Sequence, residues 1–391
     1  MRILLISRCT PYPLYLGDRL IVYHLARELA ARGHKIDLLA FGDPEQDCTP
    51  FAEHFRDIHI IPESPRGVGS YLRRLANPVG RFPAVEAEAW SPDMWRAIKR
   101  AFDAHAYDLA HLFGGIHVYE FARAVEPLPM LITPYESYTL FLSRLAAKNG
   151  DVGTWLRLQV AREFERWMFT PYAKTVVVAD RDRDELLRLN PKLPVEVISN
   201  GIDLSYFTPQ TDQPRDPATL LFTGNFDYAP NVDAAIRLAI DILPRVRQVI
   251  PDAKVQLVGN KPPPEMCALN SDTVSVPGRV PDIRPYLAKA SAFVSPLRLG
   301  AGIKNKVLEA LAMACPVIAS PLSLDGIDAR DSHEVLVADS DAAVVDSIIR
   351  LLNNHALAAQ LGAYGRKLIE DHYSWGIVAD RYEALYQQIV R

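Results

Sequence analysis

The residues that decide the fold read Ile-Leu-Leu-Ile-Ser at positions 3–7 and Lys-Ile-Asp-Leu-Leu-Ala-Phe at positions 35–41. Both runs are short and rich in aliphatic side chains, as is typical of a strand buried in a parallel sheet. The segment between them starts with a proline-rich loop, continues as a helix expected over residues 20–32, and stops at Gly33. Strand, helix and strand at this spacing predict a parallel β-α-β unit and an α/β fold.

The same alternation fills the first half of the chain and then restarts. A polar, proline-rich stretch at residues 204–218 separates the two series and is expected to be a linker. Doubly wound sheets bind ligands beyond the carboxyl ends of their strands, so we expect two Rossmann-like domains that face each other across a cleft. Further strands are expected at 58–61, 109–112, 130–133, 175–178 and 195–198, and in the second series at 219–224, 254–258, 273–276, 292–295, 317–320 and 335–337.

Composition excludes several classes of protein. The chain has 43 Lys and Arg against 47 Asp and Glu, so it has no overall basic field and no nucleic-acid partner is expected. Cys9, Cys48, Cys267 and Cys315 lie far apart without a C-x-x-C spacing, which argues against a disulfide framework and a zinc site. The apolar run at residues 3–6 is too short for a signal peptide or a membrane span. We therefore expect a cytoplasmic protein.

A glycine- and lysine-rich segment at residues 300–309 reads Gly-Ala-Gly-Ile-Lys-Asn-Lys-Val-Leu-Glu. A helix is expected over residues 303–313, so the segment comprises the loop before this helix and its first turns. The N-terminus of such a helix would attract an anion. Lys304 and Lys306 are unfavourable in a first helical turn unless an anion offsets their charge. The segment therefore predicts a diphosphate site, with Glu309 placed to hold a ribose diol. The alternative is a structural loop with solvated lysines.

Several short motifs, spread over nearly the whole chain, resemble those of one large family. They are Gly17 at the end of a loop, Ser199-Asn200-Gly201-Ile202-Asp203 with Phe207, Gly278-Arg279-Val280 with Asp282 and Tyr286, Glu309-Ala310-Leu311-Ala312 with Pro316-Val317, and Tyr373-Ser374-Trp375. Together they resemble the retaining, GT-B-fold glycosyltransferases of the family 4 type, which include sucrose synthases and mannosyltransferases of lipid glycosylation.

The resemblance implies a hexosyltransferase-type enzyme that moves a sugar from a nucleotide diphosphosugar to a hydroxyl acceptor in glycan, polysaccharide or glycolipid assembly. It implies no cofactor and no metal. Residues 1–203 would bind the acceptor, residues 204–374 would bind the donor, and a helix at 375–391 would pack back on the first domain. The donor-binding residues that it implies are Gly17, Gly224, Asn225, Gly278, Arg279, Val280, Gly300, Ala301, Gly302, Ile303 and Glu309.

The chain departs from the family at two places. The acid that usually stands eight residues before Glu309 is replaced by Ala301. The arginine and lysine that often follow the first strand of the second domain are absent from residues 224–231. We infer that Lys304 and Lys306 replace these cations at the phosphates and act in catalysis, while backbone N–H groups of residues 301–303 hold part of the sugar. Some members of the family related to polysaccharide export share this pattern of Gly-Ala-Gly with lysines.

The candidates in the first domain are two histidines and two polar residues at an expected strand end. The family usually places a histidine where this chain has Phe113, which leaves His111 and His117 as candidate catalytic residues. A packed core histidine is the alternative for His111. Glu136 and Ser137 follow another expected strand and are candidates for contact with the acceptor.

The segment 180–184, Asp-Arg-Asp-Arg-Asp, looks like a metal-binding Asp-x-Asp pair. Because it begins an expected helix, where acids are favoured by the helix dipole, we interpret it as helix capping and surface charge.

Alternative functions are a sugar-nucleotide epimerase or a phosphorylase on the same fold, or a non-catalytic sugar-nucleotide binder. A dinucleotide-dependent oxidoreductase is disfavoured because no G-x-G-x-x-G turn follows the first strand. Residues 71–75 and 155–167 mix aromatic, apolar and basic side chains as interfacial helices do, and core helices with solvated arginines have the same composition. Peripheral contact with the inner membrane surface is therefore an open expectation.

Overall fold

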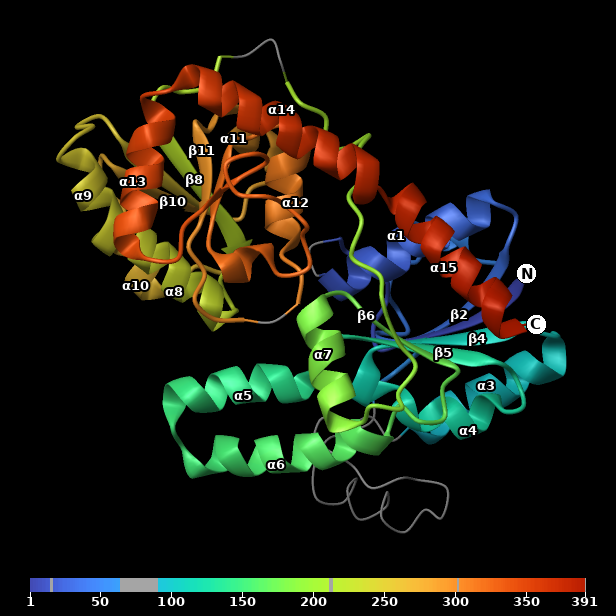
Figure 1. The fold of residues 1–391 in the computed structure, drawn as a ribbon. Helices are drawn as coiled ribbons and strands as arrows, with labels where there is room; N and C mark the ends of the chain where they lie inside the picture. The colour runs from blue at the N-terminus through green and yellow to red at the C-terminus, as the bar shows by residue number, and fades with distance from the viewer. Residues whose placement is uncertain (15–16, 64–90, 211–213, 301, 391) are drawn as a thin grey trace. The chain divides into compact units, whose positions relative to one another are not determined.

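The computed structural model describes residues 1–14, 17–63, 91–210, 214–300 and 302–390. The chain forms two compact units, which Figure 1 shows as ribbons: unit 1 comprises Met1–Asn200 with Trp375–Arg391, and unit 2 comprises Gly201–Ser374. The first division falls three residues before the expected boundary at 203/204. The expected interfacial segment at 71–75 lies outside the described residues.

Unit 1 is built on a parallel sheet with the order β3-β2-β1-β4-β5-β6-β7 in its described residues. The apolar runs of the sequence form its central strands, and every residue of β4 is buried. Since β1 lies between β2 and β4, the strand order reverses at β1/β4. The strands are β1 (Arg2–Ser7), β2 (Lys35–Phe41), β3 (Asp57–Ile61), β4 (Leu109–Phe113), β5 (Met130–Tyr135), β6 (Lys174–Val177) and β7 (Val195–Val197).

The helices of unit 1 include one from the far end of the sequence. The C-terminal helix packs on α1, where Arg32 contacts Glu383 at 3.1 Å and His24 stacks on Trp375 at 5.0 Å between ring centroids. The helices are α1 (Gly17–Ala31), α3 (Pro92–Ala104), α4 (Ala122–Val125), α5 (Tyr138–Asn149), α6 (Val152–Trp167), α7 (Asp180–Leu189) and α15 (Trp375–Val390), with 3₁₀ turns η1 (Ala52–His54), η2 (Gly115–His117) and η3 (Tyr119–Phe121).

Unit 2 repeats this architecture with the strand order β10-β9-β8-β11-β12-β13 among its described residues. All its strand pairs are parallel, so the carboxyl ends of its strands lie along one edge. The order reverses at β8/β11. The strands are β8 (Thr219–Asn225), β9 (Lys254–Asn260), β10 (Val274–Gly278), β11 (Ala292–Ser295), β12 (Val317–Ala319) and β13 (Leu336–Val337).

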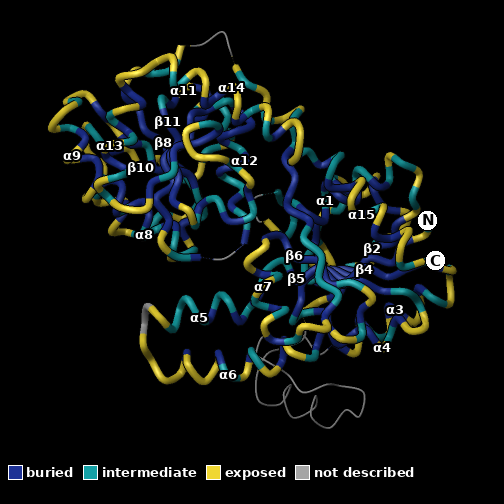
Figure 2. The backbone as a smooth tube through the Cα atoms, viewed as in Figure 1, coloured by how far each residue is buried: buried dark blue, intermediate teal, exposed yellow. Residues whose placement is uncertain are grey.

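The helices of unit 2 bury their apolar faces in one hydrophobic core with the sheet, which appears as dark tubes in Figure 2. They are α8 (Ala229–Arg237), the π-helix η4 (Leu238–Ile242), α9 (Leu243–Arg247), α10 (Pro264–Cys267), α11 (Arg284–Lys289), α12 (Asn305–Ala312), the 3₁₀ turn η5 (Pro321–Leu324), α13 (Asp341–Leu352) and α14 (His355–His372). The two doubly wound sheets confirm the predicted α/β, Rossmann-like fold. No helix among the described residues is both long and apolar enough to cross a membrane.

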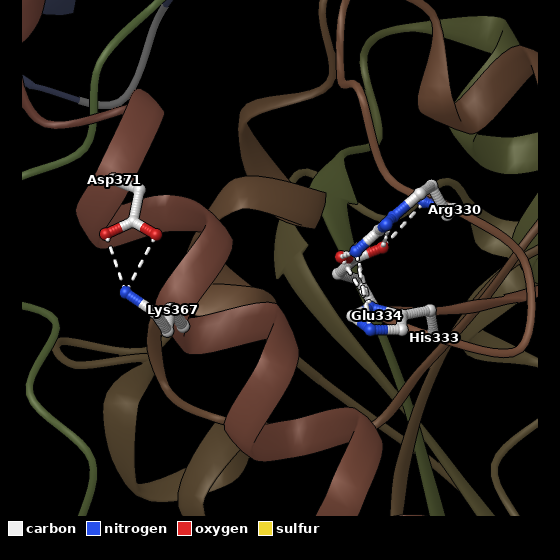
Figure 3. A network of polar contacts seen from close by, with 5 residues as sticks. All are labelled: Arg330, His333, Glu334, Lys367 and Asp371. Atoms are coloured by element: carbon white, nitrogen blue, oxygen red, sulfur yellow. Dashed lines mark hydrogen bonds and ion pairs between the residues drawn. The ribbon is translucent and has the colours of Figure 1, made fainter.

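A polar network shown in Figure 3 holds the loop before β13. Glu334 is buried and accepts hydrogen bonds from Arg330 at 2.7 Å and from the Arg330 backbone N–H at 2.8 Å, and it contacts His333 at 2.6 Å. Burial alone would raise the pKa of Glu334, but these hydrogen bonds hold it at about 2. The carboxylate therefore stays charged wherever unit 2 is folded at ordinary pH.

Candidate active site

The carboxyl ends of β8 and β11 meet at the point where the strand order of unit 2 reverses. Such a switch point is where open α/β sheets bind ligands. Segment 224–231 starts with the last two residues of β8 and runs into α8, and the glycine- and lysine-rich segment 300–309 follows β11. The tertiary structure therefore brings together two segments discussed above. Segment 300–309 is rich in glycine and lysine, and segment 224–231 lacks the basic residues that the family often has there.

The glycine loop has the backbone conformation that its sequence suggested. Gly300 has φ of 121° and Gly302 has φ of 66°, both in the region that favours glycine. A Cβ at Gly300 would lie 3.3 Å from the Tyr228 hydroxyl, which belongs to the loop after β8. Ala301 lies outside the described residues, so its predicted contact with the donor stays a prediction.

The helix starts later than predicted. We expected it to begin at Ile303, whereas α12 begins at Asn305 and Lys304 occupies the N-cap position without a side-chain cap. Lys304 is only 7% exposed, and its ammonium donates a hydrogen bond to the Gly302 carbonyl. Lys304 thus braces the glycine loop from within, and Ile303 lies in that loop.

Lys306 points toward the end of β8. Its ammonium donates a hydrogen bond to Asn231 Oδ1 and lies 4.5 Å from the centroid of the Phe222 ring. Asn231 is buried and donates from Nδ2 to the Asn225 carbonyl at 2.8 Å, which fixes its amide orientation. Lys306 therefore brings its cation to the segment in which the family's basic residues are absent.

Burial gives this site two groups that titrate near neutrality. Desolvation, with help from the charge of Lys304, lowers the pKa of Lys306 to about 7. Desolvation also raises the pKa of Glu309 to about 7, although the charge of Lys306 opposes this shift. An anion placed beside Lys306 would favour its protonated form and offset the free energy needed to bury the charged ammonium.

Two glycines allow the backbone and the Asn231 side chain to pack closely at the carboxyl end of β8. A Cβ at Gly224 would lie 3.0 Å from the Asn231 side chain, and a Cβ at Gly259 would lie 1.7 Å from the Gly224 carbonyl oxygen. Side chains at either position would displace the segment that holds Asn231. Gly224 and Asn225, both predicted to bind the donor, thus also shape the lysine's surroundings.

Neither Asn231 nor Arg237 was singled out as an individual residue by the sequence analysis. Arg237 is buried and donates to the Pro296 carbonyl at 2.7 Å, which supports the loop after β11, and it is also paired with Asp341. The absence of basic residues from 224–231 drew attention to the segment that contains Asn231. The hydrogen-bond partner of Asn231, Lys306, lies 75 residues away in the sequence. For Arg237 no sequence signal distinguishes it from a surface arginine of α8.

The remaining predicted donor residues of unit 2 lie at the carboxyl end of β10, two strands from β8. Gly278 ends β10 with φ of 77°, Arg279 is exposed, and Val280 packs on the core of unit 2. Arg298 is paired with Asp233 at 3.3 Å and lines a surface pocket of about 480 Å³ beside α8. Arg298 thus faces α8, whereas Gly278 lies on the strand-end edge with Gly224.

In unit 1 the reversal point of the sheet carries a pair of charged residues. Gly17 is the first residue of α1, and the Arg8 guanidinium holds the next residue, Asp18, at 2.5 Å. The pKa of Asp18 is lowered: its burial opposes this, but the charge and hydrogen bonds of Arg8 outweigh the burial. Gly114, after β4, has φ of 127° and lies so close to Arg8 that a Cβ would be 2.5 Å from it. The start of α1 at Gly17 is therefore next to a partly buried ion pair.

The two candidate histidines occupy different surroundings. His111 is fully buried, with Nδ1 2.6 Å from the Tyr386 hydroxyl and Nε2 2.8 Å from Thr133 Oγ1. Burial holds its pKa well below the usual value. These contacts correspond to the alternative of a packed core histidine, which here fastens α15 to the sheet. His117 ends η2, directly beyond the carboxyl end of β4.

Ser137 and Asp182 belong to a helix-capping network. Ser137 caps α5, donates to Glu165 at 2.8 Å, and its backbone N–H donates to Asp182 at 2.8 Å. Asp182 is buried and accepts at the N-terminus of α5, so the interpretation of this residue as a cap of its own helix or as surface charge is wrong. Asp180 and Asp184 pair with Arg183 at 2.6 and 2.7 Å on the surface, as interpreted from the sequence.

Comparisons with known proteins agree with this architecture. Residues 20–206 match the family described as Glycosyltransferase Family 4, and residues 217–354 match Glycosyl transferases group 1. A curated relative is the GDP-mannose-dependent monoacylated alpha-(1-6)-phosphatidylinositol monomannoside mannosyltransferase of Corynebacterium glutamicum, 28% identical over 213 residues. That alignment covers 49% of this chain, and the chain spans about half (56%) of the relative's length.

Solved structures share the whole fold. Sucrose-phosphate synthase from Thermosynechococcus elongatus is 21% identical with a TM-score of 0.76, over 99% of this chain and 98% of that one. Anabaena HepE in complex with UDP is 12% identical with a TM-score of 0.72, over 99% and 100% of the two chains. Two family matches that together run through both units, and likeness to these structures along the full chain, lead to one conclusion: the chain belongs to the GT-B glycosyltransferases of the family 4 type.

Proposed function

We propose that the protein is a retaining, metal-independent hexosyltransferase that takes its sugar from a nucleotide diphosphosugar bound on unit 2. The observation that carries the proposal is the position of Lys306, whose ammonium contacts Asn231 at the reversal point of the sheet. A nucleoside diphosphate that leaves the sugar carries growing negative charge, and preorganised cations lower the barrier by stabilising that charge.

Each predicted donor contact has a separate task in this proposal. Lys306 and the N-terminus of α12 stabilise the diphosphate, and Lys304 keeps the glycine loop in shape for it. Glu309 accepts hydrogen bonds from the ribose hydroxyls, and residues 278–280 offer backbone groups to the base. Anabaena HepE was solved with UDP and with UDP-glucose, which supports a nucleotide-sugar donor for this fold.

The proposal of metal independence is based on the contacts of the aspartates in segment 180–184, which resemble a metal-binding pair in the sequence. Asp182 accepts a hydrogen bond from the backbone at the N-terminus of α5, while Asp180 and Asp184 form ion pairs with Arg183. The positive charge that a metal would supply is then provided by Lys306. Full activity after chelation with EDTA is expected, and a loss that magnesium restores would contradict this part of the proposal.

The acceptor is a hydroxyl group, and we propose that it belongs to a growing glycan or glycolipid. The curated relative is named for a phosphatidylinositol mannoside acceptor, which supports a lipid-linked substrate. Unit 1 supplies the acceptor site, with His117 and Glu136 beyond the ends of β4 and β5 as candidate contacts.

A thermal-shift screen against UDP, GDP, ADP and dTDP sugars tests donor binding, because a ligand that binds the native state raises its melting temperature. One nucleotide should stabilise the wild type and fail to stabilise Lys306→Ala. Lys367→Ala, which removes an exposed lysine paired with Asp371, is the matched control. Equal stabilisation of both variants would contradict the assignment of Lys306.

Turnover separates the alternatives. The donor that binds should be consumed only with a hydroxyl acceptor, and NMR of the product should show the anomeric configuration of the donor. Epimerisation without acceptor would indicate an epimerase, and sugar release to inorganic phosphate would indicate a phosphorylase. Binding without any turnover over an acceptor panel would favour the non-catalytic binder that the Ala301 substitution suggests.

A further inference from the structure

Helices α5 and α6 form a hairpin that extends away from the sheet of unit 1 (Figure 1). Gly150, in the left-handed conformation, ends α5, and the Asp151 side chain caps α6 by accepting from the Thr154 N–H at 2.8 Å. The two helices bury a small apolar cluster between them, made of Leu142, Leu158 and Ala161. The inner face of α6 is therefore already occupied.

The outer face of α6 is apolar as well. Val152, Trp155, Leu156 and Val160 are 72%, 54%, 53% and 44% exposed, and we call them the α6 stripe. At 100° per residue these four side chains share one side of the helix, opposite the buried cluster. Figure 2 shows this part of α6 as exposed.

The α6 stripe is unusual for this molecule. Ten large apolar side chains are exposed among the described residues, and four of them belong to this one helix face. The other six are scattered over both units, as single exposed apolar residues are on any soluble surface. A continuous apolar patch of this kind marks a surface that binds something.

Charge around the stripe identifies the partner. At 100° per residue Arg157 and Arg162 lie on either flank of the stripe. No acidic residue occurs between Val152 and Arg162, the preceding acid, Asp151, is engaged in its helix cap, and the following one, Glu163, is paired with Arg166 at 3.3 Å. An apolar stripe containing tryptophan and flanked by arginines is the pattern of helices that lie in the interface of an anionic membrane.

We propose that the α6 stripe docks unit 1 on an anionic lipid surface. Trp155 and Leu156 insert at the level of the headgroups, and Arg157 and Arg162 contact lipid phosphates. The helix lies on the membrane without crossing it, in agreement with the absence of a membrane-spanning helix from the described residues. This docking does not depend on the identity of the donor.

Vesicle co-sedimentation tests the proposal with the full chain. The wild type should bind vesicles of phosphatidylcholine mixed with phosphatidylglycerol, and should bind pure phosphatidylcholine far more weakly. The variant Trp155→Ser/Leu156→Ser should lose roughly tenfold or more in partitioning, because apolar burial and charge act together at an interface. The matched control Ile240→Ser/Val249→Ser removes two similarly exposed side chains from unit 2 and should bind like wild type.

Two further measurements keep the result unambiguous. Brominated phosphatidylglycerol should quench tryptophan fluorescence in the wild type, and this quenching should be lost when Trp155 is replaced by serine. No binding of the wild type to anionic vesicles at low salt would overturn the proposal. Self-association that the stripe variant abolishes, without vesicle binding, would assign the stripe to a second copy of the chain instead. Nucleotide-induced thermal shifts should be the same in all these variants, so the outcome is independent of the donor site.

Discussion

Lys306 and Asn231 are joined by a hydrogen bond that links the first turn of α12 to the first turn of α8, the helix that follows β8. Asn231 is held in turn by the Asn225 carbonyl, so the lysine meets a fixed acceptor at the carboxyl end of the sheet. The ammonium also lies over the Phe222 ring, which contributes further electrostatic attraction. We propose that this contact lets a chain without the family's basic pair present a cation there.

Replacement of Lys306 by alanine should lower kcat by roughly 100-fold or more, because loss of one preorganised electrostatic donor costs about this much in other enzymes. Lys304→Ala should also depress turnover sharply, by loosening the loop that its side chain braces. Steady-state kinetics with the identified donor gives both values, with Lys367→Ala as the control. Near-normal rates for both loop variants would refute the assignment.

Nucleoside diphosphate binding should take up protons above neutral pH. The pKa of Lys306 is about 7 in the free protein, and a bound diphosphate should raise it by favouring the charged form. Affinity should therefore weaken as pH rises above about 7, where binding must first protonate the lysine. Isothermal titration calorimetry at about pH 8 in buffers of different ionisation enthalpy measures the uptake.

Glu309 titrates in the same range as Lys306, so a control must separate the two residues. In Lys306→Ala the uptake that belongs to the lysine should disappear. An unchanged proton count in that variant would assign the titration to another group.

A methyl group at Gly300 should disrupt the loop. Alanine there would be strained at φ of 121° and would press its Cβ against the Tyr228 hydroxyl at 3.3 Å. We expect Gly300→Ala to destabilise the protein by about 1–3 kcal/mol and to weaken nucleotide binding. Gly33→Ala, at φ of 84° in open space outside the site, should be strained without affecting the nucleotide. Urea unfolding and nucleotide titration of both variants decide between local and general effects.

His111→Phe should destabilise the protein by about 1–3 kcal/mol, because it leaves the hydroxyls of Tyr386 and Thr133 buried without their partner. Tyr386→Phe removes the same contact with α15 and should be non-additive with it in a double-mutant cycle. The folded His111→Phe enzyme should keep its kcat within about twofold, as expected for residues that only pack. A large loss of kcat with unchanged stability would restore His111 as a catalytic residue.

The Glu334 network should make the stability of unit 2 depend on pH. The folded pKa of about 2 lies below the ordinary value of 4.5, so the stabilisation is complete above the ordinary value and is lost as pH falls toward 2. Glu334→Gln should lower stability at pH 7 by about 1–2 kcal/mol and flatten the acid limb of the curve. Asp371→Asn, in the exposed pair of Figure 3, should change little. An acid limb that Glu334→Gln leaves unchanged would contradict this account.

Much of the fold was predictable because it depends on local patterns. Short apolar runs separated by helix-length segments predicted both sheets, and the strand ends agree closely, as at residues 109–113 and 219–225. The start of α12 was misplaced by two residues because Gly302 and Lys304 prolong the loop, and a helical pattern does not reveal where the backbone leaves it.

The sequence by itself determined the two α/β units, the family, and the glycine loop as a candidate phosphate site, since periodicity and short motifs are local properties. Only the tertiary structure decided which lysine reaches the end of β8, that Lys304 turns back into its own loop, and that His111 is fixed in the core. The contacts of Lys306 and His111 join residues 75 and 275 positions apart, whereas Lys304 contacts Gly302 only two residues away, in a loop whose backbone path the sequence does not reveal. The direction of a buried side chain is set by the partners that satisfy its polar atoms, and those partners are adjacent only in the folded chain.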